Sequence, residues 1–546
     1  MDILERIAGW AERTPASLAF SSPEGEMTYG ELWEYAGRLC AYIETIQGEG
    51  PLPVWGHKSP WMLVCFLALA RAGRGYCPLD TSLPRERAEV ILSALQGGPL
   101  FAVAFFPGSS ALPVMGLEEI QRICRGEAGE RKETVEEKEK EEKKELIGEG
   151  DKQETEKKKE EESKERKKQK EEPEEKEKQD EDIFYVIFTS GSTGTPKGVM
   201  VKRGNLSRFV DWSLTLSGEE PGRVFLNQAP FSFDLSVMDL YTCLASGGTL
   251  FALTKEEQGD YKKLLAALEK SRASVWVSTP SFAELCLADP GFSKSLLPEL
   301  SVMLFCGETL TNKTAGRLLS AFPGVKIYNT YGPTESTVAV TSVLVEEKLV
   351  KEVEPLPVGR AKPGTWIEIW DEQGRPLPEG EKGEVVLWGD TVTAGYLGRE
   401  DLTRGAFLER DEERGYRTGD EGYLKDGFLF YCGRLDLQIK LHGYRMELGD
   451  IESALLTLPE VNQAVVLPRY RQGRVSSLLG VLVLSKEYAT QIEGGEKPEK
   501  EVLEGIRLAL KEKLPEYMVP KKLVQVQDIP MTANGKADRK ALSGRL

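Results

Sequence analysis

The chain has 546 residues, of which 40% are hydrophobic, and its formal net charge is −17. A chain of this length needs more than one hydrophobic core, and its acidic balance argues against a general affinity for nucleic acid or for anionic membranes. Only two histidines occur, and none of the eight cysteines forms a Cys-x-x-Cys pair, so neither a zinc cluster nor a Ser-His-Asp triad is expected.

The first residues, 1–6, are amphipathic and lack a basic region followed by an apolar run, which argues against a signal peptide. No run of about 18 uncharged apolar residues occurs, so a membrane-spanning helix is not expected. Most of the cysteines have apolar neighbours, which is typical of reduced thiols in a protein core. We therefore expect a cytoplasmic protein.

Short apolar strands alternate with helices along most of the chain. Such alternation predicts largely parallel sheets, with ligands bound at the carboxyl ends of the strands. Helices are predicted over residues 61–72, 85–95, 261–271 and 312–321, and strands over 76–80, 224–226, 273–277, 303–305 and 326–328.

A highly charged segment, residues 127–182, interrupts this pattern with 25 acidic and 17 basic residues. It has almost nothing to bury, so core contacts cannot offset the entropy of ordering it. Glu and Lys four residues apart could support a helix in part, broken at Pro173 and around 148–150. We expect a disordered or partly helical insertion that acts as a solvated spacer, with binding of a partner as the alternative.

Beyond residue 357 the strands become shorter and the turns richer in glycine, and a helix, two strands and a second helix follow residue 441. The sequence therefore predicts an α/β fold with a hinged C-terminal domain. The large N-terminal domain, residues 1–433, would combine parallel αβ subdomains with a small β-rich subdomain. A hinge at 434–436 would join it to a small, mobile α+β domain, 437–546.

The stretch IFTSGSTGTPKGVM, residues 187–200, follows an apolar run and combines three glycines, several hydroxyls and a lysine. These residue types suit a loop that holds phosphate through backbone N–H groups, hydroxyls and a point charge. The Walker A pattern does not fit, because Pro196 stands where it needs glycine and Gly198 where it needs Ser or Thr. A plain surface turn is the alternative.

Four more positions carry possible chemistry. Asp234 is a lone carboxylate in an apolar setting, and Glu335 follows a Gly-Pro turn; Asp420 could accept hydrogen bonds from ribose, and Lys536 lies on a glycine turn near the end of the chain. Read alone, each has an ordinary alternative as a helix cap, a turn residue or a surface charge.

Read together, TSGSTGTPKG, NTYGPTE, YRTGD, GRLDLQIKLHGYRMELGDIE and NGKADRK resemble, in this order, the motifs of the adenylate-forming superfamily of acyl-CoA synthetases, luciferases and peptide-synthetase adenylation domains. The resemblance runs from residue 27 to residue 536, interrupted only by the charged segment. It implies that the chain uses ATP. The residues that it assigns to ATP are Thr189, Ser190, Gly191, Ser192, Thr193, Gly194, Lys197, Asn329, Thr330, Tyr331, Gly332, Pro333, Thr334, Asp420, Tyr431, Cys432, Gly433, Arg434 and Lys536.

Stretches such as FLNQAPFSFDLSVMDLY and IPMTANGK closely resemble the superfamily members that activate D-alanine and load it onto a D-alanyl carrier protein, for D-alanylation of (lipo)teichoic acid. On this resemblance Asp234 meets the substrate ammonium group, while Cys286 and Val338 narrow the pocket around a methyl side chain. A buried carboxylate without a partner is costly, so Asp234 by itself also favours an amino acid over a fatty or aryl acid.

The resemblance implies the catalytic roles as well. Lys536 would reach the substrate carboxylate and the nucleotide, Arg434 would contact the nucleotide, and Glu335 would be a ligand of Mg²⁺. The C-terminal domain would rotate about Asp436 between two half-reactions, so that the turn at 441–445 replaces Lys536 at the site.

Three other functions remain open from the sequence. The nearest is a stand-alone peptide-synthetase adenylation enzyme for another small amino acid. An acyl-CoA synthetase is disfavoured by Asp234, and a non-catalytic binding protein is disfavoured by the joint presence of Lys536, Glu335 and Asp420.

Overall fold

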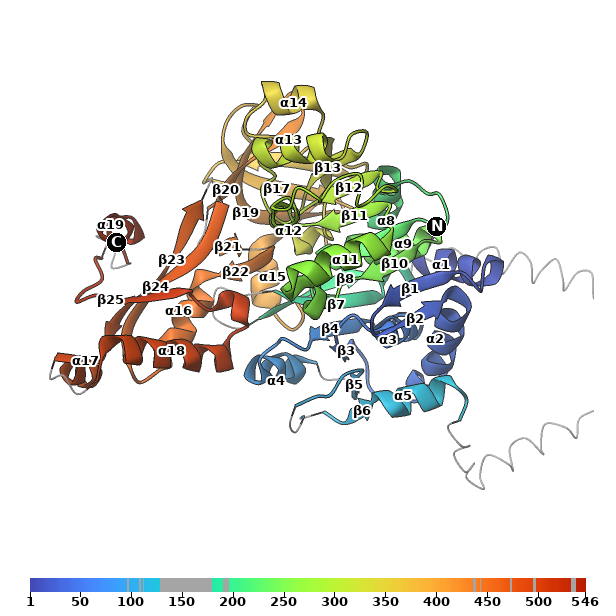
Figure 1. Ribbon diagram of the computed structural model, residues 1–546, viewed down its shortest axis with the longest axis horizontal. Coiled ribbons are helices and arrows are strands. Elements are labelled where there is room, and N and C mark those ends of the chain that lie inside the picture. The colour runs from blue at the N-terminus through green and yellow to red at the C-terminus, as the bar shows by residue number, and fades with distance from the viewer. Residues whose placement is uncertain are drawn as a thin grey trace, which may run out of the picture.

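The computed structural model describes residues 1–95, 98–107, 110, 112–127, 179–189, 196–435, 438–441, 443–471, 474–493, 497–531 and 537–546. Over these residues the chain forms five β-sheets with flanking helices. Figure 1 shows the C-terminal elements, coloured orange to red, on one side of a larger body that contains the rest of the chain.

A six-stranded sheet has the order β6-β5-β3-β4-β7-β8, and its neighbours are parallel except for β7 and β8. In the β7–β8 pair Thr189 lies opposite Lys197, so the proposed phosphate loop connects these two strands. Residues 190–195 of that loop lie outside the described residues. The strands are β3 (Leu52–Gly56), β4 (Tyr76–Asp80), β5 (Leu100–Ala102), β6 (Val114–Gly116), β7 (Ile183–Thr189) and β8 (Lys197–Lys202), with helices α3 (Pro60–Arg71), α4 (Arg85–Ala94) and α5 (Leu117–Cys124).

A nine-stranded sheet has the order β15-β14-β13-β12-β11-β9-β10-β1-β2 and is parallel from β13 to β1. Its strands are β1 (Leu18–Ser22), β2 (Gly25–Thr28), β9 (Val224–Asn227), β10 (Thr249–Ala252), β11 (Val275–Ser278), β12 (Val302–Phe305), β13 (Lys326–Tyr331), β14 (Thr341–Leu344) and β15 (Arg360–Ala361). Its helices are α1 (Ile3–Arg13), α2 (Tyr29–Ile43), α8 (Arg203–Ser217), α9 (Leu235–Ser246), α10 (Lys255–Gly259), α11 (Tyr261–Ser271), α12 (Pro280–Cys286), α13 (Asn312–Ala321) and α14 (Glu347–Glu352).

One hydrophobic core joins these two sheets through the helices between them. It includes Phe66 of α3, Tyr185 of β7, Phe209 of α8 and Tyr241 of α9. The sequences of α3 and α9 are apolar on almost every face, and both helices are buried over nearly their whole length, as such a pattern requires. The alternation of strands and helices predicted from the sequence is confirmed.

The third sheet is the β-rich part predicted beyond residue 357. All of its neighbouring strands are antiparallel, and β20 pairs with β19 beside the path β16-β17-β19-β18. Its elements are β16 (Thr365–Trp370), β17 (Gly383–Gly389), α15 (Glu400–Ala406), β18 (Phe407–Arg410), β19 (Glu413–Lys425) and β20 (Phe428–Arg434).

The small C-terminal domain has its own core, with Met446, Ile451, Leu482 and Leu510 at its centre. A two-stranded hairpin leads into it, and a three-stranded sheet of order β23-β24-β25 follows. Its elements are β21 (Gln438–Leu441), β22 (Tyr444–Glu447), α16 (Leu448–Leu456), β23 (Val461–Arg471), β24 (Arg474–Leu484), α17 (Lys486–Glu493), α18 (Glu499–Lys513), β25 (Lys522–Gln525) and α19 (Arg539–Arg545).

Most of the predicted insertion, residues 128–178, lies outside the described residues. Its last four residues belong to the packed fold, because Asp182 O accepts a hydrogen bond from Arg203 N at 2.8 Å and Asp180 pairs with Arg208 at 3.4 Å. The C-terminal end of the predicted segment is therefore in contact with the large domain. Asp180 pairs with Arg208 of α8, and Glu181 pairs with Lys202, which directly precedes this helix.

Candidate functional site

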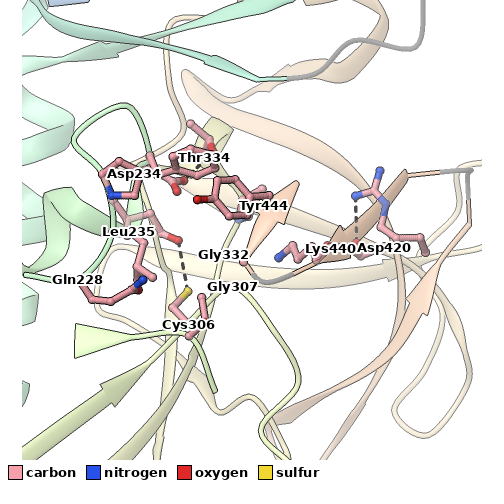
Figure 2. A pocket seen from close by; sticks show the side chains of 18 residues that line it. Gln228, Asp234, Leu235, Cys306, Gly307, Gly332, Thr334, Asp420, Lys440 and Tyr444 are labelled. Carbon is pink, nitrogen blue, oxygen red and sulfur yellow. Dashed lines mark hydrogen bonds and ion pairs between the residues drawn. The ribbon is translucent and has the colours of Figure 1, made fainter. Parts of the chain in front are cut away.

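Asp234 lies at the carboxyl end of β9, where the loop 228–234 leads into α9. It occupies the cap position of α9, yet its side chain does not cap the helix. The carboxylate instead accepts a 2.5 Å hydrogen bond from the Thr334 hydroxyl, which comes from the segment after β13. Figure 2 shows these two side chains at one end of a pocket. The loop thus places a carboxylate in a cavity rather than on a helix end.

A fully buried lysine, Lys58, anchors the start of this loop. Its Nζ donates to Asn227 Oδ1 and to Ala229 O, and Asn227 Nδ2 donates to Asp239 Oδ1 at 2.8 Å. Burial lowers the pKa of Lys58 to about 7 and raises the pKa of Asp239 well above its usual value. Sequence reasoning did not single out Lys58, because a lone lysine after a strand has no distinctive pattern.

Compact apolar side chains form part of the wall of the cavity beside Asp234. Val338 and Cys306 line it together with Leu235, and the Cys306 thiol lies 3.8 Å from Val338 O. Burial raises the pKa of the Cys306 thiol, so the group behaves as a small apolar surface.

The predicted pocket residue Cys286 lies elsewhere. It is fully buried in the second core cluster, beside Phe282 of the same helix, and does not line this cavity. The thiol at the cavity is Cys306, which directly follows β12. The rule that ligands bind at the carboxyl ends of parallel strands would have indicated it.

A second group of predicted residues meets between the nine-stranded and β-rich sheets. The Tyr331 hydroxyl donates to Asp420 Oδ2 at 2.5 Å, and Arg434 Nη1 donates to Asp420 Oδ1 at 2.9 Å. Asp420 and Arg434 face each other in the β19–β20 register, although 14 residues separate them. Tyr431 adds an aromatic face, with its ring centroid 5.9 Å from that of Tyr331.

A groove runs beside this group and continues the cavity. It is lined by the following residues assigned to ATP: Asn329, Thr330, Tyr331, Gly332, Tyr431, Cys432, Gly433 and Arg434. Gly332 is required here by close approach, because a Cβ at this position would lie 2.5 Å from Ala339 Cα. An aromatic face, a tight turn and a paired carboxylate suit a nucleoside with free ribose hydroxyls.

Glu335 is fully buried, and its Oε1 accepts a 2.8 Å hydrogen bond from the Tyr396 hydroxyl. Among the described residues no group of three His, Cys, Asp or Glu side chains could hold a metal ion. A single carboxylate fits Mg²⁺, which keeps several waters and is bound mostly by substrate phosphates. Thr189 Oγ1 is buried and has no hydrogen-bond partner among the residues that the structure describes, as a donor reserved for a ligand oxygen would be.

The hairpin β21–β22 enters the same pocket from the C-terminal domain. Lys440, Gly443 and Tyr444 line the cavity beside Asp234. The Tyr444 ring packs edge-on against Phe233 at 4.5 Å and stacks on Tyr517 at 3.8 Å. The turn predicted to replace Lys536 is thus at the site. Sequence reasoning passed over Lys440, which resembles an exposed strand lysine.

Lys197 points toward the C-terminal domain in this arrangement. Its Nζ lies 3.4 Å from Glu447 Oε1, and 5.4 Å from the centre of the Tyr396 ring. The remaining predicted residues, Ser190, Gly191, Ser192, Thr193, Gly194, Asp436 and Lys536, lie outside the described residues.

Comparison with protein families identifies the class. The model of the AMP-binding enzymes matches residues 7–397, and the model of the AMP-binding enzyme C-terminal domain matches residues 450–536. The chain belongs to the AMP-binding enzymes, which use ATP.

Curated relatives identify the family within this class. The D-alanine–D-alanyl carrier protein ligases of Bacillus licheniformis and Bacillus velezensis are each 42% identical to the chain, over 544 and 548 residues, or 99% of both proteins in each comparison. At this identity over the full length, the chain is a member of the D-alanine–D-alanyl carrier protein ligase family.

Solved structures agree on the fold. A Vibrio cholerae adenylation domain in complex with glycyl-adenosine-5'-phosphate is 21% identical with a TM-score of 0.75, covering 100% of this chain and 97% of that one. An o-succinylbenzoate CoA synthetase of Bacillus subtilis is 19% identical with a TM-score of 0.76, covering 99% and 98%. Separately, none of the helices in the described part of the chain has the length and apolar character needed to span a membrane.

Proposed function

We propose that the protein activates D-alanine with ATP as D-alanyl-adenylate and transfers the D-alanyl group to the phosphopantetheine thiol of a D-alanyl carrier protein. The observation that carries this proposal is the Asp234 carboxylate in a cavity that Cys306 and Val338 also line. A carboxylate there suits an ammonium group, and two compact apolar side chains suit a methyl group. The resemblance extends the role to D-alanylation of (lipo)teichoic acid, with ATP consumed in the cytoplasm.

In the first half-reaction a carboxylate oxygen of D-alanine attacks the α-phosphorus of ATP and pyrophosphate leaves. Two anions must meet, so positive charge has to be supplied at the site. We assign this role to Lys536, with Lys197 beside the β- and γ-phosphates. Thr189 is suited to bond a phosphate oxygen, since its buried hydroxyl has no partner within the described part of the chain.

The nucleotide would occupy the groove beside Tyr331. Asp420, held by Tyr331 and Arg434, would accept hydrogen bonds from both ribose hydroxyls. Glu335 would hold Mg²⁺, which neutralises phosphate charge when bound.

In the second half-reaction the carrier thiol attacks the D-alanyl carbonyl carbon and AMP leaves. No enzyme thiol is needed, which agrees with the raised pKa of the buried Cys306. Lys440 lines the cavity with Asp234 and could offset charge on the departing phosphate. We propose that a rotation of residues 437–546 about the hinge at 434–436, centred on Asp436, exchanges Lys536 for this hairpin.

Amino-acid-dependent ATP–pyrophosphate exchange tests the function. D-alanine, L-alanine, glycine and D-serine are compared side by side with the full chain. Strong preference for D-alanine, followed by thioester formation on the carrier, is the expected result. Preference for another amino acid would instead favour a stand-alone peptide-synthetase adenylation enzyme.

A further inference from the structure

The Glu308 side chain bridges the two parts of the molecule at the site. Its Oε1 accepts a 2.7 Å hydrogen bond from the backbone N–H of Gly443, in the turn of the C-terminal hairpin. Its Oε2 accepts a 3.1 Å hydrogen bond from the backbone N–H of Ser281, in the first turn of α12. One carboxylate thus ties the hairpin backbone to a helix of the large domain.

The hairpin fits closely at this point. Gly443 has φ +83°, and a Cβ added there would lie 2.4 Å from Thr279 Cγ2. Thr279 itself caps α12, accepting a hydrogen bond from Phe282 N at 3.4 Å. The depth to which the hairpin enters the pocket is therefore limited on one side by Thr279 and fixed on the other by Glu308.

The two oxygens of the Glu308 carboxylate satisfy both donors. Two N–H groups converge on the two oxygens of Glu308, whereas a glutamine offers one oxygen and would direct its NH₂ group at the second donor. Hydrogen bonds to a charged acceptor are also shorter and stronger than those to a neutral amide.

We propose that Glu308 is a positioning residue for the second half-reaction: it sets the place of the hairpin that carries Lys440 and Tyr444 into the pocket. This rests on the proposed function. In that step the carrier thiol gives up its proton to solvent, and the C–S bond forms. The bond between the acyl carbon and the phosphate oxygen breaks, and AMP leaves with the electron pair. A shift of about 1 Å in groups that line such a site can cost up to about a hundredfold in rate.

A second carboxylate provides a matched control. Glu284 lies on α12, the helix to which Glu308 is hydrogen-bonded. It also contacts the C-terminal domain, because it forms an ion pair with Arg474 Nη1 at 3.0 Å. Glu308 lines the groove beside Tyr331, whereas Glu284 lines neither this groove nor the cavity that contains Asp234. If any contact between the large and small domains supported transfer to the carrier, substitutions of Glu284 and of Glu308 would lower transfer equally.

The experiment compares Glu308→Gln, Glu308→Ala and Glu284→Gln in the full chain. For each, amino-acid-dependent pyrophosphate exchange is measured, followed by single-turnover transfer of the aminoacyl group to the phosphopantetheine-bearing carrier over a range of carrier concentrations. Glu308→Gln should lower the ratio of transfer to exchange about tenfold and Glu308→Ala more, through the rate at saturating carrier. Glu284→Gln should leave this ratio within about twofold of the wild type.

The proposal is overturned if transfer persists in the Glu308 variants, if transfer and exchange fall in parallel, or if Glu284→Gln reproduces the selective loss. Should Glu308→Ala fail to fold, the nearly isosteric Glu308→Gln decides. A wild-type protein that exchanges with an amino acid other than D-alanine would refute the proposed substrate, and the same comparison made with that amino acid would still test Glu308.

Discussion

Asp234 is the residue on which the choice of substrate depends. Its carboxylate lies in the pocket and accepts a hydrogen bond from Thr334 at 2.5 Å. Replacing this carboxylate by a neutral amide removes the charge that would neutralise the substrate ammonium group. The groove beside Tyr331, where the nucleotide would bind, is not changed by this substitution.

Asp234→Asn is therefore expected to raise the KM for D-alanine at least about thirtyfold, while the KM for ATP changes little. Pyrophosphate exchange titrated separately with each substrate measures both values. Asp528→Asn removes an exposed carboxylate and serves as the control. An unchanged KM for D-alanine would contradict the assignment of Asp234 as the partner of the substrate ammonium group.

Several site residues could be found from the sequence because they occur in dense local motifs. Asp420, Tyr331 and Arg434 are such cases, and the structure brings them within hydrogen-bonding or stacking distance of one another or of Tyr431. Cys286 was assigned wrongly because its helix turns it toward the core, together with Phe282. Helix phase over seven residues is weakly specified by sequence alone.

Other residues could not be found in this way because their significance lies in tertiary contacts. Lys58 becomes notable only when its Nζ reaches Asn227 and Ala229, across more than 160 residues. Glu308 becomes notable only when Gly443 donates to it from the other domain. A sequence pattern shows local periodicity, but it does not show which residues far apart in the chain form hydrogen bonds with each other.

At the scale of elements, the β21–β22 hairpin is the structure most closely fitted to the site. Its turn at Gly443 requires a left-handed backbone and leaves no room for a Cβ beside Thr279. The resemblance placed the turn at 441–445 at the site, but the depth of the hairpin in the pocket depends on packing that the sequence does not reveal.

Gly443→Ala is expected to lower transfer to the carrier about tenfold or more relative to exchange. The left-handed conformation alone costs an alanine roughly 1–2 kcal/mol, and the contact with Thr279 adds to it. Quenched-flow transfer and steady-state exchange measure the two steps. Gly398→Ala, at another left-handed glycine with open space around it, is the control for backbone strain. Equal effects of the two substitutions on the ratio would contradict the close fit.

At the scale of the whole molecule, we propose that each half-reaction uses its own arrangement of the large and small domains. The hairpin occupies the pocket, and Tyr444 packs between Phe233 of the large domain and Tyr517 of the small one. We assign this arrangement of the two domains to thioester formation. Lys536 would then act in a different arrangement, during adenylation.

Lys536→Ala should therefore lower pyrophosphate exchange about a hundredfold or more, because a preorganised cation is lost where two anions meet. Transfer from chemically supplied D-alanyl-adenylate should stay within about threefold of the wild type. Lys521→Ala, which removes an exposed lysine of the same domain, is the control. Normal exchange by the variant would contradict the assignment.

The charged segment leaves and re-enters the large domain at ordered ends. Glu127 N donates to Arg122 O, and Arg203 N donates to Asp182 O. Replacing residues 128–178 by a short Gly-Ser linker should thus leave exchange activity and the unfolding temperature close to those of the wild type, since loop length has a weak effect on stability. Both are measured on the purified variant, and a large loss of exchange would assign the segment a role in adenylation.

The pairing of β1 with β10 has a consequence for the newly made chain. β1 closes in parallel against β10, and Leu18 and Thr249, which bond to each other there, are 231 residues apart. At ribosomal speeds of 5–20 residues per second, the first strand waits on the order of 10–50 s for its partner to be synthesised. During that interval the apolar side chains of β1 face water or a chaperone, so the N-terminal segment completes its folding only after the middle of the chain has left the ribosome.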